Sequence, residues 1–108
     1  MAREMSHAPL PALLLYTRAG CHLCDEARAI LAAILAERVA AGLPAPAIEE
    51  RDIETDEDWQ RDNFAAIPVV EIGELRLELA TSAARLRRLL AEALDAGTVD
   101  RGPTIGGG

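Results

Sequence analysis

The stretch Tyr16-Thr17-Arg18-Ala19-Gly20-Cys21-His22-Leu23-Cys24 decides how the rest of the chain is interpreted. It holds the only two cysteines among the 108 residues, three positions apart. Two thiols with this spacing at the start of a helix can close into a small ring with little backbone movement, which favours a disulfide that forms and opens reversibly. The pair therefore indicates thiol-disulfide exchange. Half of a metal site, or a pair without chemistry, are the alternatives.

The residues on either side predict a strand, a turn and a long helix. Residues 12–17 are apolar without alternation, as in a strand buried on both faces, and Gly20 supplies the turn. A helical pattern begins near Asp25 and ends at Gly42 and Pro44. Its expected apolar face is Leu23, Ala27, Ile30, Leu31, Ile34 and Leu35, while Glu26, Arg28, Glu37 and Arg38 mostly take the other side.

A short strand and a short helix are predicted next. Residues 47–53 are charged and have few apolar anchors, which is typical of a strand at a sheet edge. Thr55 followed by Asp58 resembles a helix start. Trp59 and Phe64 are the expected anchors of that helix.

The last part of the chain predicts a hairpin followed by a helix. Residues 67–72 are followed by a turn at Gly73-Glu74, and the strict alternation over residues 75–79 indicates a half-buried strand. A final helix is expected from Thr81 or Ser82 to about Ala96, with an apolar face formed by Leu86, Leu89, Leu90, Ala93 and Leu94.

This order, βαβαββα, predicts an α/β fold in a single domain over residues 12–96. Two right-handed crossovers would give a parallel part, and the hairpin an antiparallel edge, of a mixed four-stranded sheet with helices on both faces. We expect residues 1–11 to be a flexible arm and residues 97–108, which end in three glycines, to be a disordered tail.

Charge and hydropathy limit the possible partners. A net charge of -7 argues against nucleic acid, and we interpret Arg85, Arg87 and Arg88 as a solvated helix face. No segment approaches the roughly 18 apolar residues that span a bilayer, so no membrane partner is expected. A closely spaced cysteine pair suits a reducing compartment, and we expect a cytoplasmic protein.

Two segments carry a resemblance to a known family. Residues 16–24 resemble the active-site segment of the glutaredoxins, and Ile67-Pro68-Val69-Val70 resembles their second signature. Over about residues 12 to 95 the chain is most similar to the small bacterial glutaredoxin-like proteins of the thioredoxin superfamily. The resemblance implies a thioredoxin-like fold and a thiol-disulfide oxidoreductase that needs no cofactor and acts on protein or low-molecular-weight disulfides.

The resemblance also assigns roles. Cys21 matches the nucleophile, Cys24 the resolving cysteine, and Arg18 the basic residue three before the nucleophile. Pro68 matches the proline that follows a cis bond facing the disulfide, and the main chain of Ile67 would bind an extended substrate. His22 and Leu23 complete the predicted substrate-binding set, with His22 mainly an exposed spacer.

For the electron donor, the resemblance offers two candidates, a thioredoxin reductase and glutathione. Glutaredoxins that use glutathione usually have a glycine pair and an acidic residue where this chain has Leu79-Ala80-Thr81-Ser82. Asp25 and Glu26 would also repel an anionic ligand and oppose a thiolate at Cys21, which the helix N-terminus favours. We therefore expect little or no dependence on glutathione.

Two other functions compete with this prediction. Beyond the cysteines, only His7 and His22 are candidate zinc ligands, so no metal site within one chain is predicted. A dimer sharing Cys21 and Cys24 could still hold zinc or an iron-sulfur cluster. The chain could also be a thioredoxin-fold binding module whose cysteines pair without turning over.

Overall fold

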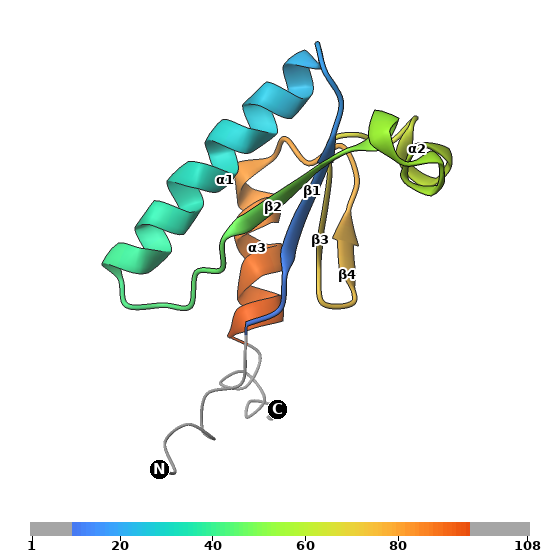
Figure 1. The fold of residues 1–108 in the computed structure, drawn as a ribbon. Helices are drawn as coiled ribbons and strands as arrows, with labels where there is room; N and C mark the ends of the chain where they lie inside the picture. The colour runs from blue at the N-terminus through green and yellow to red at the C-terminus, as the bar shows by residue number, and fades with distance from the viewer. Residues whose placement is uncertain (1–9, 96–108) are drawn as a thin grey trace.

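Four strands, three α-helices and one 3-10 helix make up residues 10–95, the part of the chain that the computed structural model describes (Figure 1). The predicted tail, and the predicted arm apart from Leu10 and Pro11, lie outside the described residues. The elements in order are β1 (Leu13–Thr17), α1 (His22–Ala40), β2 (Ile48–Asp52), the 3-10 helix η2 (Ile53–Thr55), α2 (Glu57–Asn63), β3 (Val69–Ile72), β4 (Leu75–Leu77) and α3 (Ala83–Leu94).

The four strands form one mixed sheet in the order β2-β1-β3-β4. β1 pairs parallel with β2 and antiparallel with β3, and β3 pairs antiparallel with β4. The predicted mixed sheet is confirmed, and the charged strand β2 does lie at an edge. The central strand β1 is buried almost throughout, which explains its unbroken apolar sequence.

The prediction of two parallel crossovers is wrong for the second connection. α1 returns the chain along the sheet, so β2 starts beside the start of β1, with Leu13 opposite Ile48. α2 has only seven residues and rises about 10 Å, too little to cross back over the sheet. β3 therefore starts beside the end of β1, with Val69 opposite Tyr16, and runs antiparallel to it.

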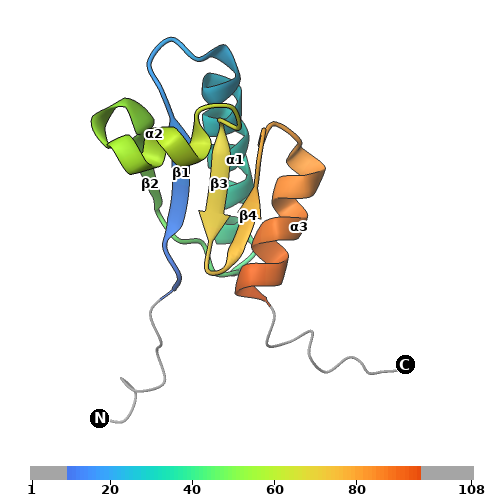
Figure 2. The same ribbon diagram turned by 90° about the vertical axis from the view of Figure 1, so that its right-hand side faces the viewer.

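Helices cover both faces of the sheet, as predicted (Figures 1 and 2). α1 and α3 pack side by side on one face, where they enclose the larger cluster of buried apolar side chains with Leu13, Leu15, Val70 and Ile72 of the sheet. α2 lies on the other side, close to the end of β1. A second cluster there contains Tyr16, Ile53, Ile67, Val69 and Cys24.

The buried face of α1 differs from the predicted one at both ends. Leu23 is 44% exposed, and the buried positions run through Cys24, Ala27, Leu31 and Ile34. Arg38, predicted on the solvent side, is buried as well. The register is shifted because Cys24, rather than Leu23, faces the sheet. The predicted end of the helix is confirmed, since Gly42 adopts a left-handed conformation with φ 75° just after α1.

Two predictions around α2 are wrong. Residues 53–55 form a 3-10 turn, so Asp56 rather than Thr55 caps α2, its carboxylate accepting hydrogen bonds from the amides of Asp58 and Trp59. Phe64 is 62% exposed and anchors nothing in the core, whereas Trp59 packs against the second cluster as predicted.

Around α3 the predictions agree better with the structure. The predicted last strand stops at Leu77, two residues early. The side chain of Ser82 caps α3 through the amide of Arg85, and the three basic side chains of that helix are exposed, as predicted.

Candidate functional site

A disulfide joins Cys21 and Cys24 at the N-terminus of α1, and their Cα atoms are 5.2 Å apart. Cys21 is the N-cap residue and is partly exposed, whereas Cys24 lies inside the helix and is 0% exposed. Cys21 therefore precedes the first turn of α1, and Cys24 lies on the buried side of that turn. The two cysteines of one disulfide thus have different surroundings: Cys21 is partly exposed, whereas Cys24 is fully buried in the second apolar cluster.

The turn between β1 and α1 presents Cys21 to the helix terminus. Gly20 has φ 73°, a conformation that glycine adopts without steric cost. The Cys21 sulfur accepts a hydrogen bond from the amide of Cys24 at 3.1 Å, and the Cys21 carbonyl accepts one from the amide of Asp25 at 3.2 Å. Such a helix end stabilises negative charge, so it favours a thiolate at Cys21 when the disulfide is reduced.

The charges near the disulfide are more balanced than the sequence alone suggests. Asp25 pairs with Arg28 at 2.7 Å, and the His22 ring lies 3.3 Å from the Glu26 carboxylate. Both acidic side chains of the first turn therefore have local partners. His22 is exposed, as predicted, and so is Arg18.

The segment predicted to face the disulfide does lie next to it. The Ile67–Pro68 peptide bond is cis, and Ile67 belongs to the same apolar cluster as both cysteines. The Ile67 amide donates a hydrogen bond to the Asn63 carbonyl at 3.2 Å, and the ring of Pro68 is fully buried. Because the Ile67 amide is already bonded within the chain, the Ile67 carbonyl is the main-chain group of this residue that is suited to bind a substrate amide.

Leu79 lies outside the strand in which the sequence pattern placed it. Leu79 continues the alternation of Leu75 and Leu77, so it is predicted as a strand residue. The structure instead bends the chain there: the Leu79 amide donates to the Ala66 carbonyl at 2.9 Å, and the Ala80 amide donates to the Pro68 carbonyl at 2.8 Å. These two bonds hold the loop before α3 against the segment that contains the cis peptide.

A polar network links α1 to the edge strand one turn beyond the cysteines. Arg28 donates two hydrogen bonds to the Glu50 carboxylate, at 2.9 and 2.6 Å, and the buried hydroxyl of Thr17 donates a third at 2.8 Å. The bonds from Arg28 hold the pKa of Glu50 below its usual range, against the opposing effect of burial and with a further contribution from Thr17. The network fastens the start of α1 to β2.

On the opposite face, Arg51 lies over the rings of Trp59 and Tyr16, at 4.9 and 5.7 Å from their centroids. The two rings contact each other edge to face at 6.1 Å. These contacts fix α2 beside the second apolar cluster, because cation–π and edge-to-face pairs both favour one relative orientation.

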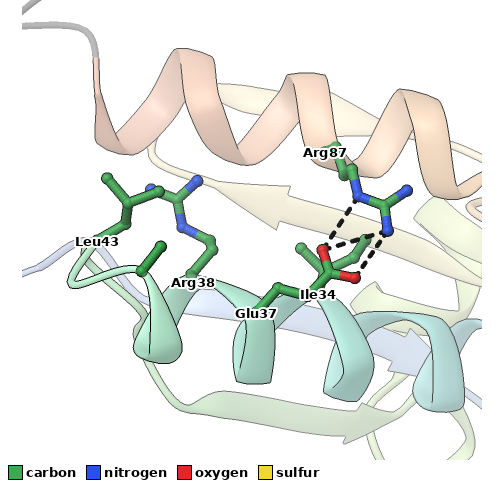
Figure 3. A pocket seen from close by; sticks show the side chains of 6 residues that line it. Ile34, Glu37, Arg38, Leu43 and Arg87 are labelled. Atoms are coloured by element: carbon green, nitrogen blue, oxygen red, sulfur yellow. Dashed lines mark hydrogen bonds and ion pairs between the residues drawn. The ribbon is translucent and has the colours of Figure 1, made fainter.

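A separate hollow of about 280 Å³ lies at the other end of α1 (Figure 3). Its walls come from Ile34, Ala41 and Leu43, and an ion pair between Arg87 and Glu37, 3.0 Å apart, stands at its rim. Arg38, which also lines it, is paired with Asp95. The hollow contains none of the predicted site residues.

No helix within residues 10–95 has the length and apolarity needed to cross a membrane. Within the same residues, no three His, Cys, Asp or Glu side chains gather as a metal site would require.

Comparisons with known proteins agree with this geometry. Residues 12–94 match the family described as Glutaredoxin-like domain. The fold is similar to the X-ray structure of the Northeast Structural Genomics target protein XcR50 from X. campestris, with a TM-score of 0.56 and 28% sequence identity over 85% of this chain and 100% of that one. No curated protein shows significant similarity to the chain.

Proposed function

Because the chain belongs to the glutaredoxin-like family and joins Cys21 and Cys24 at a helix N-terminus, we propose that it is a thiol-disulfide oxidoreductase. The observation that carries this proposal is the unequal exposure of the two cysteines within one disulfide, since Cys21 is partly exposed and Cys24 is fully buried. An accessible sulfur can attack or be attacked, and a buried neighbour three residues on can complete the exchange. The substrates would be protein or low-molecular-weight disulfides.

The reaction follows from these positions. In the dithiol form, the Cys21 thiolate attacks one sulfur of a substrate disulfide, forms a mixed disulfide and expels the other substrate sulfur as a thiolate. Cys24 then loses its proton and attacks the Cys21 sulfur, which releases the second substrate thiolate and closes the Cys21–Cys24 disulfide. Two electrons pass from the protein to the substrate, and an external dithiol donor must reduce the protein again.

Other groups near the disulfide have supporting roles in this proposal. Arg18, exposed beside the turn, would attract a thiolate or an anionic part of the substrate. The Ile67 carbonyl would accept a hydrogen bond from the amide of an extended substrate next to its reacting sulfur. His22 and Leu23, both exposed, would border the bound substrate.

The test is a redox titration of the purified protein against glutathione or dithiothreitol buffers. We expect a two-electron couple at about -200 to -270 mV, in the range of cytosolic carriers. Catalytic reduction of a small neutral disulfide, 2-hydroxyethyl disulfide, by dithiothreitol or thioredoxin reductase should depend on Cys21. The proposal would be contradicted if Cys21 and Cys24 never formed a disulfide under mild oxidation, or if cytosolic reductants could not reduce that disulfide.

Two further experiments distinguish the oxidoreductase from the two alternatives, a metal-binding dimer and a binding module. Metal analysis and absorption spectra would reveal a dimer that holds zinc or an iron-sulfur cluster through the cysteines. A binding module would retain its partner after both cysteines were replaced. A cytoplasmic location suits the proposed function, because the disulfide must be reduced in each cycle.

A further inference from the structure

We propose that Leu79 is a specificity-determining residue that directs the site toward disulfides flanked by apolar residues of a polypeptide. This inference rests on the proposed oxidoreductase function and names the class of substrate for the same site.

The backbone of Leu79 is unusual. Its φ of 49° makes it the only described residue other than glycine with a positive φ. A leucine in the left-handed region is disfavoured, because its Cβ approaches neighbouring main-chain atoms that glycine would leave clear. Conformations of this kind persist where the surrounding structure holds them, and they cluster at binding sites.

Hydrogen bonds hold Leu79 in this conformation. Its amide is bonded to the Ala66 carbonyl, its own carbonyl accepts from the Thr81 amide at 2.8 Å, and the next amide is bonded to the Pro68 carbonyl. Leu79 is therefore attached directly to the segment that packs with Cys21. Figures 1 and 2 show the loop before α3 at the same end of the sheet as the start of α1 and the start of β3.

The side chain that this conformation presents is apolar and 57% exposed. Another large exposed apolar side chain, Leu23, stands between the two cysteines, and Phe64 is exposed at the C-terminal end of α2. The remaining large exposed apolar residues are Leu10, Val39 and Leu43, which belong to the other end of the sheet and of α1. The end of the molecule that contains the disulfide thus has exposed apolar side chains from two separate segments, the start of α1 and the loop before α3.

The substrate suited to these side chains is a polypeptide with apolar residues next to its cysteine. Each apolar contact that excludes water would favour such a substrate, by about tenfold for the area of half a leucine side chain. A small polar thiol such as glutathione cannot make these contacts. Leucine at position 79 would therefore select polypeptide disulfides at the binding step, while leaving the chemistry at Cys21 unchanged.

The test compares two capped five-residue peptides, each with a central cysteine in a mixed disulfide with 2-mercaptoethanol. One peptide has leucine on both sides of the cysteine, and the other has serine. The dithiol form of the full-length protein is mixed with each peptide, and its second-order rate constant is divided by that of dithiothreitol, which corrects for the intrinsic reactivity of the two disulfides. The variant is Leu79→Asn, since asparagine tolerates the left-handed conformation. Leu43→Asn is the matched control at the far end of α1.

We expect the wild-type protein to prefer the leucine peptide by about tenfold, and Leu79→Asn to lower this ratio at least about threefold. Leu43→Asn should leave it unchanged. Leu79→Gly, which also fits the observed φ, should repeat the result if the asparagine variant folds poorly. Equal rates with both peptides, or an unchanged ratio in both Leu79 variants, would overturn this inference while the proposed function stands. No reaction with either peptide would refute the proposed function itself.

Discussion

The amide of Cys24 donates a hydrogen bond to the sulfur of Cys21, with 3.1 Å between nitrogen and sulfur. Cys21 therefore caps the helix that contains its own disulfide partner. On reduction, the same amide is placed to stabilise a thiolate on Cys21, because hydrogen bonding to the charged form favours that form. No comparable advantage is evident for Cys24, which is fully buried one turn further along.

The two cysteines should therefore have different roles. Cys24→Ser should leave a reactive Cys21 that accumulates a mixed disulfide with a substrate protein, whereas Cys21→Ser should abolish both attack and trapping. Serine at position 21 is a favoured N-cap, so the second variant should keep its fold. Mass spectrometry of the adducts identifies the attached cysteine.

Cys24→Ala is the control for the serine hydroxyl that Cys24→Ser would bury. It should trap the same substrates as Cys24→Ser. Adducts attached through Cys24 in the Cys21→Ser protein would reverse the assignment of the two roles.

Glutathione should reduce the protein's disulfide substrates slowly. Residues 79–82 lack the glycine pair that the resemblance to glutaredoxins associates with glutathione use, and Asp25 and Glu26 lie near the start of α1 beside the disulfide. Arg28 pairs with Asp25 and His22 lies next to Glu26, so the two carboxylates should repel glutathione less than their number suggests. The loop before α3 is therefore the stronger reason to expect slow turnover with glutathione. The measurement is turnover of 2-hydroxyethyl disulfide with glutathione against turnover with dithiothreitol or thioredoxin reductase. Rapid turnover with glutathione alone would contradict this expectation.

Replacing Glu50 should make stability less sensitive to acid. The bonds from Arg28 lower the pKa of Glu50 in the folded state, so its contribution is fully present above its unfolded pKa. The contribution is lost as the pH falls through the folded value, in a window below about pH 4.5. Glu50→Gln should cost about 1 kcal/mol at pH 7, since the carboxylate is 39% exposed and partly screened.

Denaturant unfolding of wild type and Glu50→Gln between pH 7 and pH 3 measures this difference. The two curves should converge at the acid end. Glu49→Gln is the control on the same strand, because Glu49 pairs with Arg51 at a more exposed position. A gap that stays constant down to pH 3 would show that Glu50 acts through packing rather than through its charge.

Arg38 should matter for stability and not for redox activity. Its side chain is 8% exposed, donates to the Pro44 carbonyl at 2.7 Å and pairs with Asp95 at 2.6 Å. Arg38→Met should lower the free energy of unfolding by about 2 kcal/mol, because the hydrogen bonds of the buried guanidinium to the Pro44 carbonyl and to Asp95 are lost. The reaction of reduced Cys21 with 2-hydroxyethyl disulfide should not change, since the two residues are about 25 Å apart along α1.

Arg61→Met is the matched control for that loss. Arg61 pairs with Asp58 at the exposed surface of α2, where solvent screens an ion pair, so this variant should lose little stability. Equal losses of stability in the two variants would mean that burial of Arg38 adds nothing to its ion pair.

The sequence by itself determined the element order and the identity of the redox pair. Unbroken apolar residues mark β1 as a central strand, and the cysteine spacing after a glycine turn marks the start of α1. These are local signals: burial on both faces requires apolar side chains at every position, and a helix start requires a turn and a cap. The paired motifs at Cys21 and Pro68 then led to the correct family.

Three features became clear only from the folded chain: which side of α1 is buried, the antiparallel direction of β3, and the position of Leu79 outside the strand. Leu23 and Cys24 are both compatible with an apolar face, and packing against the sheet selected Cys24. β3 is antiparallel to β1 because α2 is too short to return the chain along the sheet. Leu79 leaves the strand pattern because its amide is bonded to Ala66, thirteen positions earlier in the chain. The orientation of α1 and the position of Leu79 depend on contacts between segments that are distant in sequence, and a periodic pattern of apolar residues contains no information about such contacts.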